Sequence, residues 1–397
     1  QMKSLASLDL SGWDPSSVTD FSQMFQGCSS LATIDLSGWD MSNATNLCKM
    51  FEGCSSLTSL DLSGCDVSPS ADLSDMFEGC TSLTSLNLSG CTAQTARLFL
   101  QALSTPAAIT SLGLSDMNLA GVEDLSGMFE GFSSLESLDI SGWDISSVKD
   151  LSGMFSGMAS LKSLDLTSWD VSGVEHFARM FDGCLSLASL DLSGWDVSHA
   201  TDLSTMLSGL SGLTALDLSD WDASCATSVL AGLTDPALLR SLRLSGLAVS
   251  QGNISGMFEP LSGLASLDVS NWTISGSPNL SGTFAPLSSL SSLNISSWDV
   301  SGATSLSGLF SGCTKIESLD LSGWDVSRVC DFSSMFAGDA ALVSLDLSSW
   351  DMGSARDLSS MFSGCESLES LDLSGWDVSS AKKFASIFKG CSSLEHL

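Results

Sequence analysis

Positively charged residues are scarce in this chain. Its 397 residues include 14 lysines and arginines against 46 aspartates and glutamates, which gives a formal net charge of -32. A surface this acidic repels nucleic-acid phosphates and anionic lipid headgroups. We therefore expect neither nucleic acid nor an anionic membrane surface as a partner. Cationic partners, metal ions and simple solubility remain open.

Residues that commonly carry catalysis or bind metals are also few. Histidine occurs only as His176, His199 and His396, at three different positions of the repeat described below. The sequence has no G-x-S-x-G nucleophile elbow and no phosphate-binding G-x-x-x-x-G-K-[ST] loop. No stretch approaches the ~20 consecutive apolar residues of a membrane span. We expect no enzyme, no cofactor and no transmembrane segment in this chain.

What the chain has in abundance is a 26-residue repeat, L-x-x-L-D-L-S-G-W-D-V-S-S-V-T-D-L-S-G-M-F-x-G-C-S-S. About fifteen units follow one another, and a partial unit begins near residue 394. A fixed period of this length predicts a solenoid, in which each unit buries its apolar face against its neighbours. We expect one solenoid over residues 1–397, without a capping unit and cut from a longer protein.

Each unit predicts a strand followed by a helical segment. Leu8 and Leu10 alternate with polar residues, which is typical of a short strand with one buried face, and stacked units would pair such strands in parallel. The apolar residues from Trp13 to Cys28 are spaced as on one face of a short helix, and Gly27 is placed to end it in a left-handed conformation. The predicted fold class is an α/β repeat solenoid of about fifteen right-handed coils, with a parallel β-sheet on one face and short helices or helical turns on the other.

The L-x-x-L-x-L core resembles the leucine-rich repeat. More closely, the run L-D-L-S-x-W-D-x-S-x-V-x-D-x-S-x-M-F-x-G-C is similar to the BspA-like leucine-rich repeat family of microbial surface proteins, over essentially the whole chain. The resemblance implies an extracellular or cell-surface location and adhesion to proteins or to other cells.

An aspartate column at the end of the strand segment is the first candidate binding surface. If the strands form an exposed sheet, these carboxylates lie in rows on its surface. A solvated acidic face is the favoured interpretation, and a face that binds a cationic ligand is the alternative. A calcium array is the least favoured, because each coil offers few fixed oxygens. The column consists of Asp9, Asp35, Asp61, Asp139, Asp165, Asp191, Asp217, Asp268, Asp320, Asp346 and Asp372. Asn87, Gly113, Arg243 and Asn294 fill its other positions. A second aspartate column follows the tryptophan position, beginning with Asp14, Asp40 and Asp66, and is expected to bond the next turn.

A tryptophan column is the second repeated feature. Cys65, Cys91, Met117 and Leu247 replace tryptophan in some units, which preserves apolar character without a ring. We therefore expect a structural core column rather than a glycan-stacking stripe. Its members are Trp13, Trp39, Trp143, Trp169, Trp195, Trp221, Trp272, Trp298, Trp324, Trp350 and Trp376.

Seven of the 12 cysteines share one column, which Phe132, Met158 and Leu210 occupy elsewhere. Buried free thiols acting as small apolar residues are the preferred interpretation, and bridges between adjacent coils, such as Cys65 to Cys91, are the alternative.

The repeat becomes irregular near residues 87–118 and 223–297. Arg97, Arg240 and Arg243 lie there, and so do most of the prolines, at positions 106, 236, 260, 278 and 286. Bends or worn repeats explain such stretches most simply, but they also escape the packing rules of the repeat and could hold a specific partner.

Three functions follow from these features. The first is a non-enzymatic surface or adhesion protein whose acidic Ser/Asp-lined sheet face binds a protein or a glycan. The second is an assembly component whose uncapped ends stack on other copies. The third, a minor alternative, is an ice-binding solenoid, against which the charged row argues.

Overall fold

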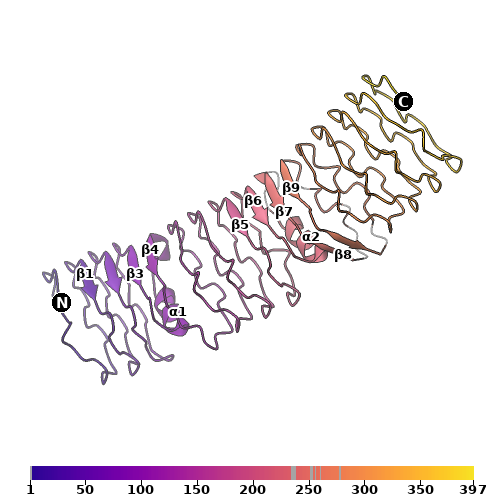
Figure 1. Ribbon diagram of the computed structural model, residues 1–397. Helices are drawn as coiled ribbons and strands as arrows, with labels where there is room; N and C mark the ends of the chain where they lie inside the picture. Colours follow the sequence, from indigo (N-terminus) through magenta and orange to yellow (C-terminus); the bar gives the residue numbers. More distant parts are fainter. Residues whose placement is uncertain (1, 234–237, 251–253, 255, 260, 277–278) are drawn as a thin grey trace. The chain divides into compact units, whose positions relative to one another are not determined.

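The computed structural model describes residues 2–233, 238–250, 254, 256–259, 261–276 and 279–397. Contacts divide the chain into two compact units. Unit 1 comprises residues 1–188 and 199–211, and unit 2 comprises residues 189–198 and 212–397. Both units are built from short parallel strands joined by turns, with few helices (Figure 1).

Unit 1 contains a four-stranded parallel sheet in the order β1-β2-β3-β4. Its strands are β1 (Thr33–Asp35), β2 (Ser59–Asp61), β3 (Ser85–Asn87) and β4 (Ser111–Gly113). The register pairs residues 26 positions apart, so that Ile34 lies opposite Leu60 and Leu60 opposite Leu86. The central residues of β1 to β3 are buried because the strand period places every second side chain inward, as the alternation predicts. A single-residue parallel bridge between Ser137 and Ser163 continues the same spacing.

Unit 2 repeats this arrangement in the order β5-β6-β7-β9. The strands are β5 (Ser189–Asp191), β6 (Ala215–Asp217), β7 (Ser241–Arg243) and β9 (Ser266–Asp268), and a second small sheet pairs β8 (Ala248–Ser250) with β10 (Thr273–Ser275). Parallel bridges then join Ser318, Ser344, Ser370 and His396 at steps of 26 residues. The fold is a parallel-strand β-solenoid.

The expected helices opposite the strands are wrong for the Met-Phe segments. In residues 21–28, backbone N–H groups donate along the solenoid to the next coil: Phe21 to Asn46 O at 2.8 Å and Phe25 to Met50 O at 2.9 Å. A helix would direct these donors four residues back along its own chain. Gln23, with φ of 60°, and Gly27, with φ of 69°, both adopt the left-handed conformation, so the segment forms consecutive turns instead.

In the two irregular stretches a helix occupies the segment that leads into these turns. In unit 1, α1 spans Ala93–Gln101, a 3-10 turn, η1, follows at Pro106–Ala108, and α1 lies across the coil from the strands (Figure 1). The Thr92 hydroxyl caps α1 by accepting from Thr95 N. In unit 2, α2 spans Ala223–Ala231, and Asp222 caps it by accepting from Ser224 N. Neither helical segment contains the glycine that the regular turns carry.

The interior consists of columns of recurring side chains stacked from coil to coil. Phe25, Phe51 and Phe77 stack at centroid separations of 5.3 and 6.0 Å. In unit 2 the corresponding rings, from Phe284 to Phe388, are spaced by 5.6 to 5.7 Å. Aromatic pairs at this separation contribute about 0.5–1.5 kcal/mol beyond the area they bury. Most coils supply the same ring, and Leu103 and Leu207 take its place in two others, so the stacked rings reinforce the register that the repeat sets.

Candidate functional site

Each aspartate of the strand column closes the turn that follows its strand. Its Oδ1 atom accepts a hydrogen bond from the backbone N–H two residues later, as between Asp346 and Ser348 at 3.1 Å. The Ser348 hydroxyl and its backbone N–H hold the pKa of the Asp346 carboxyl below its usual value. The same bond is present at Asp9, Asp35, Asp61, Asp139, Asp165, Asp191, Asp217, Asp268, Asp320, Asp346 and Asp372. These carboxylates therefore have a structural role as well as a charge.

Two further aspartate columns make the same turn bond. The aspartate that follows most of the tryptophans does so, as at Asp40 with Ser42 N at 3.0 Å. The third column does so as well: Asp72 Oδ1 accepts from Ser74 N at 2.9 Å. In the sequence, the D-x-S spacing indicates this turn bond, and all three columns share that spacing. Much of the acidity of the chain is thus explained by turn formation.

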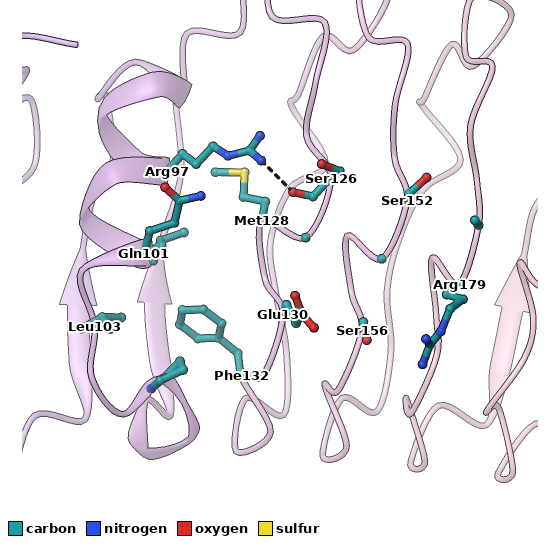
Figure 2. Close-up of a pocket in the computed structure, with 15 residues that line it drawn as sticks. Arg97, Gln101, Leu103, Ser126, Met128, Glu130, Phe132, Ser152, Ser156 and Arg179 are labelled. Carbon is teal, nitrogen blue, oxygen red and sulfur yellow. Dashed lines mark hydrogen bonds between the residues drawn. The ribbon is translucent and has the colours of Figure 1, made fainter. Parts of the chain in front are cut away.

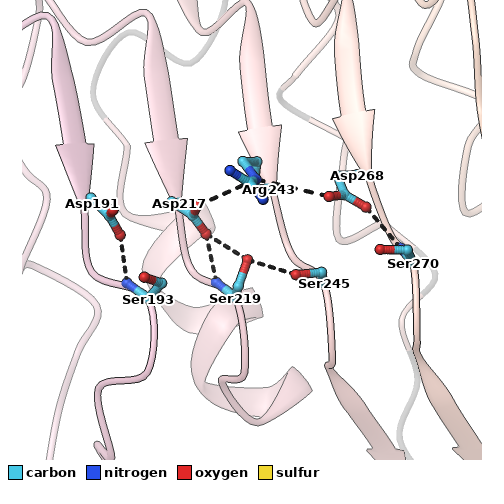
Figure 3. Close-up of polar contacts among 8 residues, drawn as sticks. All are labelled: Asp191, Ser193, Asp217, Ser219, Arg243, Ser245, Asp268 and Ser270. Carbon is cyan, nitrogen blue, oxygen red and sulfur yellow. Dashed lines mark hydrogen bonds and ion pairs between the residues drawn. The ribbon is translucent and has the colours of Figure 1, made fainter. Parts of the chain in front are cut away.

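The strand face of unit 2 contains one local neutralisation of charge (Figure 3). Arg243 replaces the column aspartate, and its Nε lies 3.4 Å from Asp217 Oδ2 and 3.8 Å from Asp268 Oδ2. Two residues beyond Arg243 and Asp217, respectively, the Ser245 hydroxyl donates to the Ser219 hydroxyl at 3.0 Å. The face is therefore not uniformly acidic, and its unbroken carboxylate run in unit 2 is Asp320, Asp346 and Asp372, all exposed.

Most of the tryptophan column lies in the interior. Trp39, Trp143, Trp169, Trp195, Trp221, Trp272, Trp298, Trp324 and Trp350 are each at most 5% exposed. Trp376 is half-buried, and Trp13, in the first coil, is 60% exposed. Most of the indoles also donate to the backbone: Trp221 Nε1 bonds Leu192 O at 2.8 Å, 29 residues earlier in the chain. A buried ring held in this way has no face available for stacking on a sugar.

The twelve cysteines are all free thiols. Cys65 Sγ, in the tryptophan column, donates to Leu36 O at 2.9 Å, and Cys91 Sγ to Leu62 O at 3.2 Å, so these two residues are hydrogen-bonded to backbone rather than bridged to each other. In the main cysteine column Cys80 Sγ donates likewise to Phe51 O at 3.2 Å. Burial raises the pKa of Cys65 and of Cys80 to about 12, so these thiols remain protonated at neutral pH and do not act as thiolate ligands.

Asp339 stands in the main cysteine column and was not recognised from the sequence. It is 1% exposed and lies between the coils of Cys313 and Cys365. Its Oδ1 accepts from Cys313 N at 2.9 Å, and burial raises the pKa of its carboxyl to about 8. The sequence does mark this position, because F-A-G-D at residues 336–339 aligns with the F-x-G-C of other units.

The irregular stretch of unit 1 contains a hollow of about 750 Å³ beside α1 (Figure 2). Arg97 and Gln101 of α1 line one side, and Leu103 and Phe132 give it an apolar end. The opposite rim is Arg179, which pairs with Asp182. Among the irregular-stretch prolines, Pro106 also lines this hollow, whereas Pro236, Pro260 and Pro278 lie outside the described residues.

Candidate metal ligands do not converge in the described part of the chain. No group of three or more His, Cys, Asp or Glu side chains is placed there to hold a metal ion. His176 Nδ1 lies 3.2 Å from the Thr201 hydroxyl. Among the described residues, no helix is long and apolar enough to cross a bilayer.

Parallel L-x-L strands stacked at a 26-residue period define the chain as a leucine-rich-repeat solenoid. The model of the family described as "Mycoplasma protein of unknown function, DUF285" matches residues 1–99, 93–221, 252–344 and 304–396, so the chain belongs to that family. No curated protein matches it.

Solved structures similar to this chain include leucine-rich repeat proteins. An internalin (inlF) from Listeria monocytogenes is 16% identical with a TM-score of 0.36, covering 93% of this chain and 86% of that chain. A leucine-rich repeat protein of Leptospira interrogans is 16% identical with a TM-score of 0.33, covering 89% of this chain and 91% of that one. TLR13, in a complex with ssRNA13, is 19% identical with a TM-score of 0.27; the match covers 94% of this chain but only 56% of the TLR13 chain.

Proposed function

We propose that this protein is a non-enzymatic interaction protein of the extracellular space or cell surface, and that its acidic strand face binds a basic protein partner. The observation that carries this proposal is the run Asp320, Asp346 and Asp372, which presents exposed carboxylates at successive coils. The resemblance to the BspA-like family supports the surface location. Hydrogen bonds that span 26 residues support the further inference that each of the about fifteen sequence units forms one right-handed coil.

The carboxylates of this run are pre-positioned for a cationic ligand. Parallel strands lie about 4.8 Å apart, so neighbouring charges repel by roughly 0.8 kcal/mol in bulk water. The Asp372 charge indeed acts to raise the pKa of Asp346, against the larger effect of Ser348. Lysine or arginine side chains spaced along an extended partner would relieve this repulsion at each coil. With a net charge of -32 the protein also steers basic partners toward itself, and this attraction is screened by salt.

The test is to replace Asp320, Asp346 and Asp372 together by asparagine. Asparagine keeps the turn bond, because Asn87 Oδ1 accepts from Ser89 N at 3.1 Å in the same column, so the fold should be retained. The probe is a lysine-rich peptide, titrated at low and at physiological ionic strength. We expect at least tenfold weaker binding and a reduced salt dependence.

The matched control changes three aspartates of the second column to asparagine, at Asp325, Asp351 and Asp377. These also make turn bonds, and the variant loses the same net charge from a different part of each coil. Full affinity in this control supports recognition by the strand face. Equal losses in the two variants would mean that only net charge matters, and the proposal would then be wrong.

A further inference from the structure

Most regular coils are joined at the Met-Phe turns by four backbone hydrogen bonds. In unit 1, Leu125 N donates to Asp150 O, Gly127 N to Ser152 O, Phe129 N to Met154 O and Gly131 N to Ser156 O, at 2.9–3.0 Å. The coil that begins at Phe21 makes the same four bonds to the coil after it. Each turn therefore offers four carbonyls to the N–H groups of the coil before it.

Helix α1 interrupts this ladder. Its N–H groups bond within the helix, as Ala96 N does to Thr92 O at 2.9 Å, so they cannot reach the following coil. By the same register, residues 99 and 101 of α1 would donate to Asp124 O and Ser126 O, and residues 103 and 105, which follow α1, would donate to Met128 O and Glu130 O. Leu103 N instead donates to Leu100 O at 3.3 Å. The Arg97 side chain supplies donors for two of these carbonyls: its guanidinium donates to Asp124 O at 2.9 Å and to Ser126 O at 3.1 Å.

The other two carbonyls have no such replacement. Within residues 2–233, which are described throughout, no group donates a hydrogen bond to Met128 O or Glu130 O. Both residues line the hollow beside α1, together with Leu103, Pro106 and Phe132. Figure 2 shows Phe132 and Leu103 at one end of this hollow and Ser156 on its far side. Two backbone carbonyls without a donor thus border the hollow of about 750 Å³, and one end of this hollow is apolar.

We propose that an extended segment of a partner polypeptide binds in this hollow and completes the ladder. Two of its backbone N–H groups, two residues apart, donate to Met128 O and Glu130 O, as neighbouring coils do elsewhere. One apolar side chain of the segment packs against Leu103, Pro106 and Phe132. This is recognition by strand addition, in which main-chain hydrogen bonds give affinity and a side-chain pocket gives selectivity. The cavity is within the size range of peptide and small-molecule sites.

This site differs from the acidic strand face in position and in chemistry. Its recognition depends on backbone donors and an apolar contact rather than on charge. The inference therefore stands or falls independently of the proposed function, because the aspartate variants described above leave the hollow unchanged.

The experiment begins with a displayed library of random peptides of about seven residues, selected on the full chain. The blocking variant is Ser156→Trp, which places an indole in the hollow. It should fold, because the same column carries Gln26, Glu52 and Glu130 in other coils and so accepts long side chains. Its matched control is Ser363→Trp, in the same column of unit 2 and not among the residues that line this hollow; both serines are half-buried. We expect selected peptides that bind wild type and Ser363→Trp but lose at least tenfold in affinity for Ser156→Trp.

The backbone requirement is tested on the peptides themselves. Methylation of single peptide nitrogens removes one donor at a time without altering the protein, and the loss of one such bond corresponds to roughly tenfold in affinity. We expect two sensitive positions, separated by one insensitive residue. A library without binders, binders indifferent to Ser156→Trp, or binders indifferent to methylation at every position would each overturn the proposal.

Discussion

The carboxyl of Asp339 should make the stability of unit 2 fall as the pH rises from weakly acidic to weakly basic. The side chain is 1% exposed and occupies a position that other coils fill with a cysteine. Burial raises its pKa from 3.8 to about 8, although the N–H groups of Cys313 and Gly312 oppose this rise. At neutral pH the folded protein therefore keeps Asp339 mainly protonated, whereas the unfolded chain ionises it.

The sign and size of the effect follow from proton linkage. Between pH 3.8 and about 8 the folded state binds one more proton at Asp339 than the unfolded state does, so stability decreases with pH. Each pH unit corresponds to 1.36 kcal/mol. From about pH 5 to about pH 8 the folded state should lose roughly 4 kcal/mol through this one group. Above the folded pKa the loss levels off.

The measurement compares wild type with Asp339→Cys, which restores the usual residue of the column. Denaturant unfolding followed by tryptophan fluorescence gives stability across this pH range. Hydrogen exchange of residues 306–365 reports local opening, because solenoids unfold regionally. The free energy of unfolding of the variant, relative to that of wild type, should rise by roughly 4 kcal/mol from about pH 5 to about pH 8.

A control variant separates this effect from the general acidity of the protein. Asp346→Asn removes an exposed carboxyl whose pKa is lowered by Ser348. Its contribution to stability is present above pH 3.8 and is lost as the pH falls through the lower folded pKa. The difference in the free energy of unfolding between Asp346→Asn and wild type should therefore be constant above about pH 5. A constant difference for Asp339→Cys as well would refute the argument, because it would mean that water reaches the Asp339 carboxylate in the folded state.

Two further variants test the packing described above. Trp350→Ala should cost about 3–5 kcal/mol in the free energy of unfolding, because the ring is 2% exposed and its removal leaves a cavity and an unbonded Leu321 carbonyl; a loss below about 1 kcal/mol would contradict a core role. Arg97→Lys should destabilise unit 1 by roughly 1–2 kcal/mol, because one ammonium cannot replace a guanidinium fork on two carbonyls, and faster hydrogen exchange confined to residues near α1 would be the diagnostic readout.

The repeat and the strands could be predicted from the sequence because both depend on local order. The 26-residue period appears directly as the offset in register, for instance between Leu60 and Leu86, and the alternation around Leu8 identifies the buried strand face. The single 25-residue step of the sequence is the pairing of Arg243 with Asp268. Nothing in these features required knowledge of contacts between distant residues.

The Met-Phe turns were predicted incorrectly because their spacing is ambiguous. Apolar residues at Phe21, Met24, Phe25 and Cys28 fit a helix, but they equally fit two stacked turns that face the same core. The deciding feature is the left-handed residue at the third position. Glycine stands there at Gly127 and Gly308, with φ of 60° and 63°, and this was the available signal against a helix.

The role of Arg97 could not be predicted from the sequence, because it depends on which carbonyls the neighbouring coil leaves without a donor. In the sequence, Arg97 is notable only as a basic residue in a strongly acidic protein. Here, however, its two carbonyl bonds repair a break in backbone pairing, and its ion pair with Asp124 accompanies them at 3.5 Å. Charge alone would have suggested an anion site.

The cysteines in the tryptophan column show how a physical requirement can differ from the one that a substitution pattern indicates. Replacement of tryptophan by Cys65 and Cys91 was interpreted as preservation of apolar bulk. In the structure, Cys65 Sγ donates to Leu36 O, 29 residues earlier, and Trp221 Nε1 donates to Leu192 O across the same interval. A buried carbonyl without a donor costs about 1–3 kcal/mol, whereas a smaller side chain can be compensated by its neighbours. The column therefore favours a side chain that is apolar and also able to donate one hydrogen bond, which tryptophan and cysteine share and which leucine, at Leu247, does not supply.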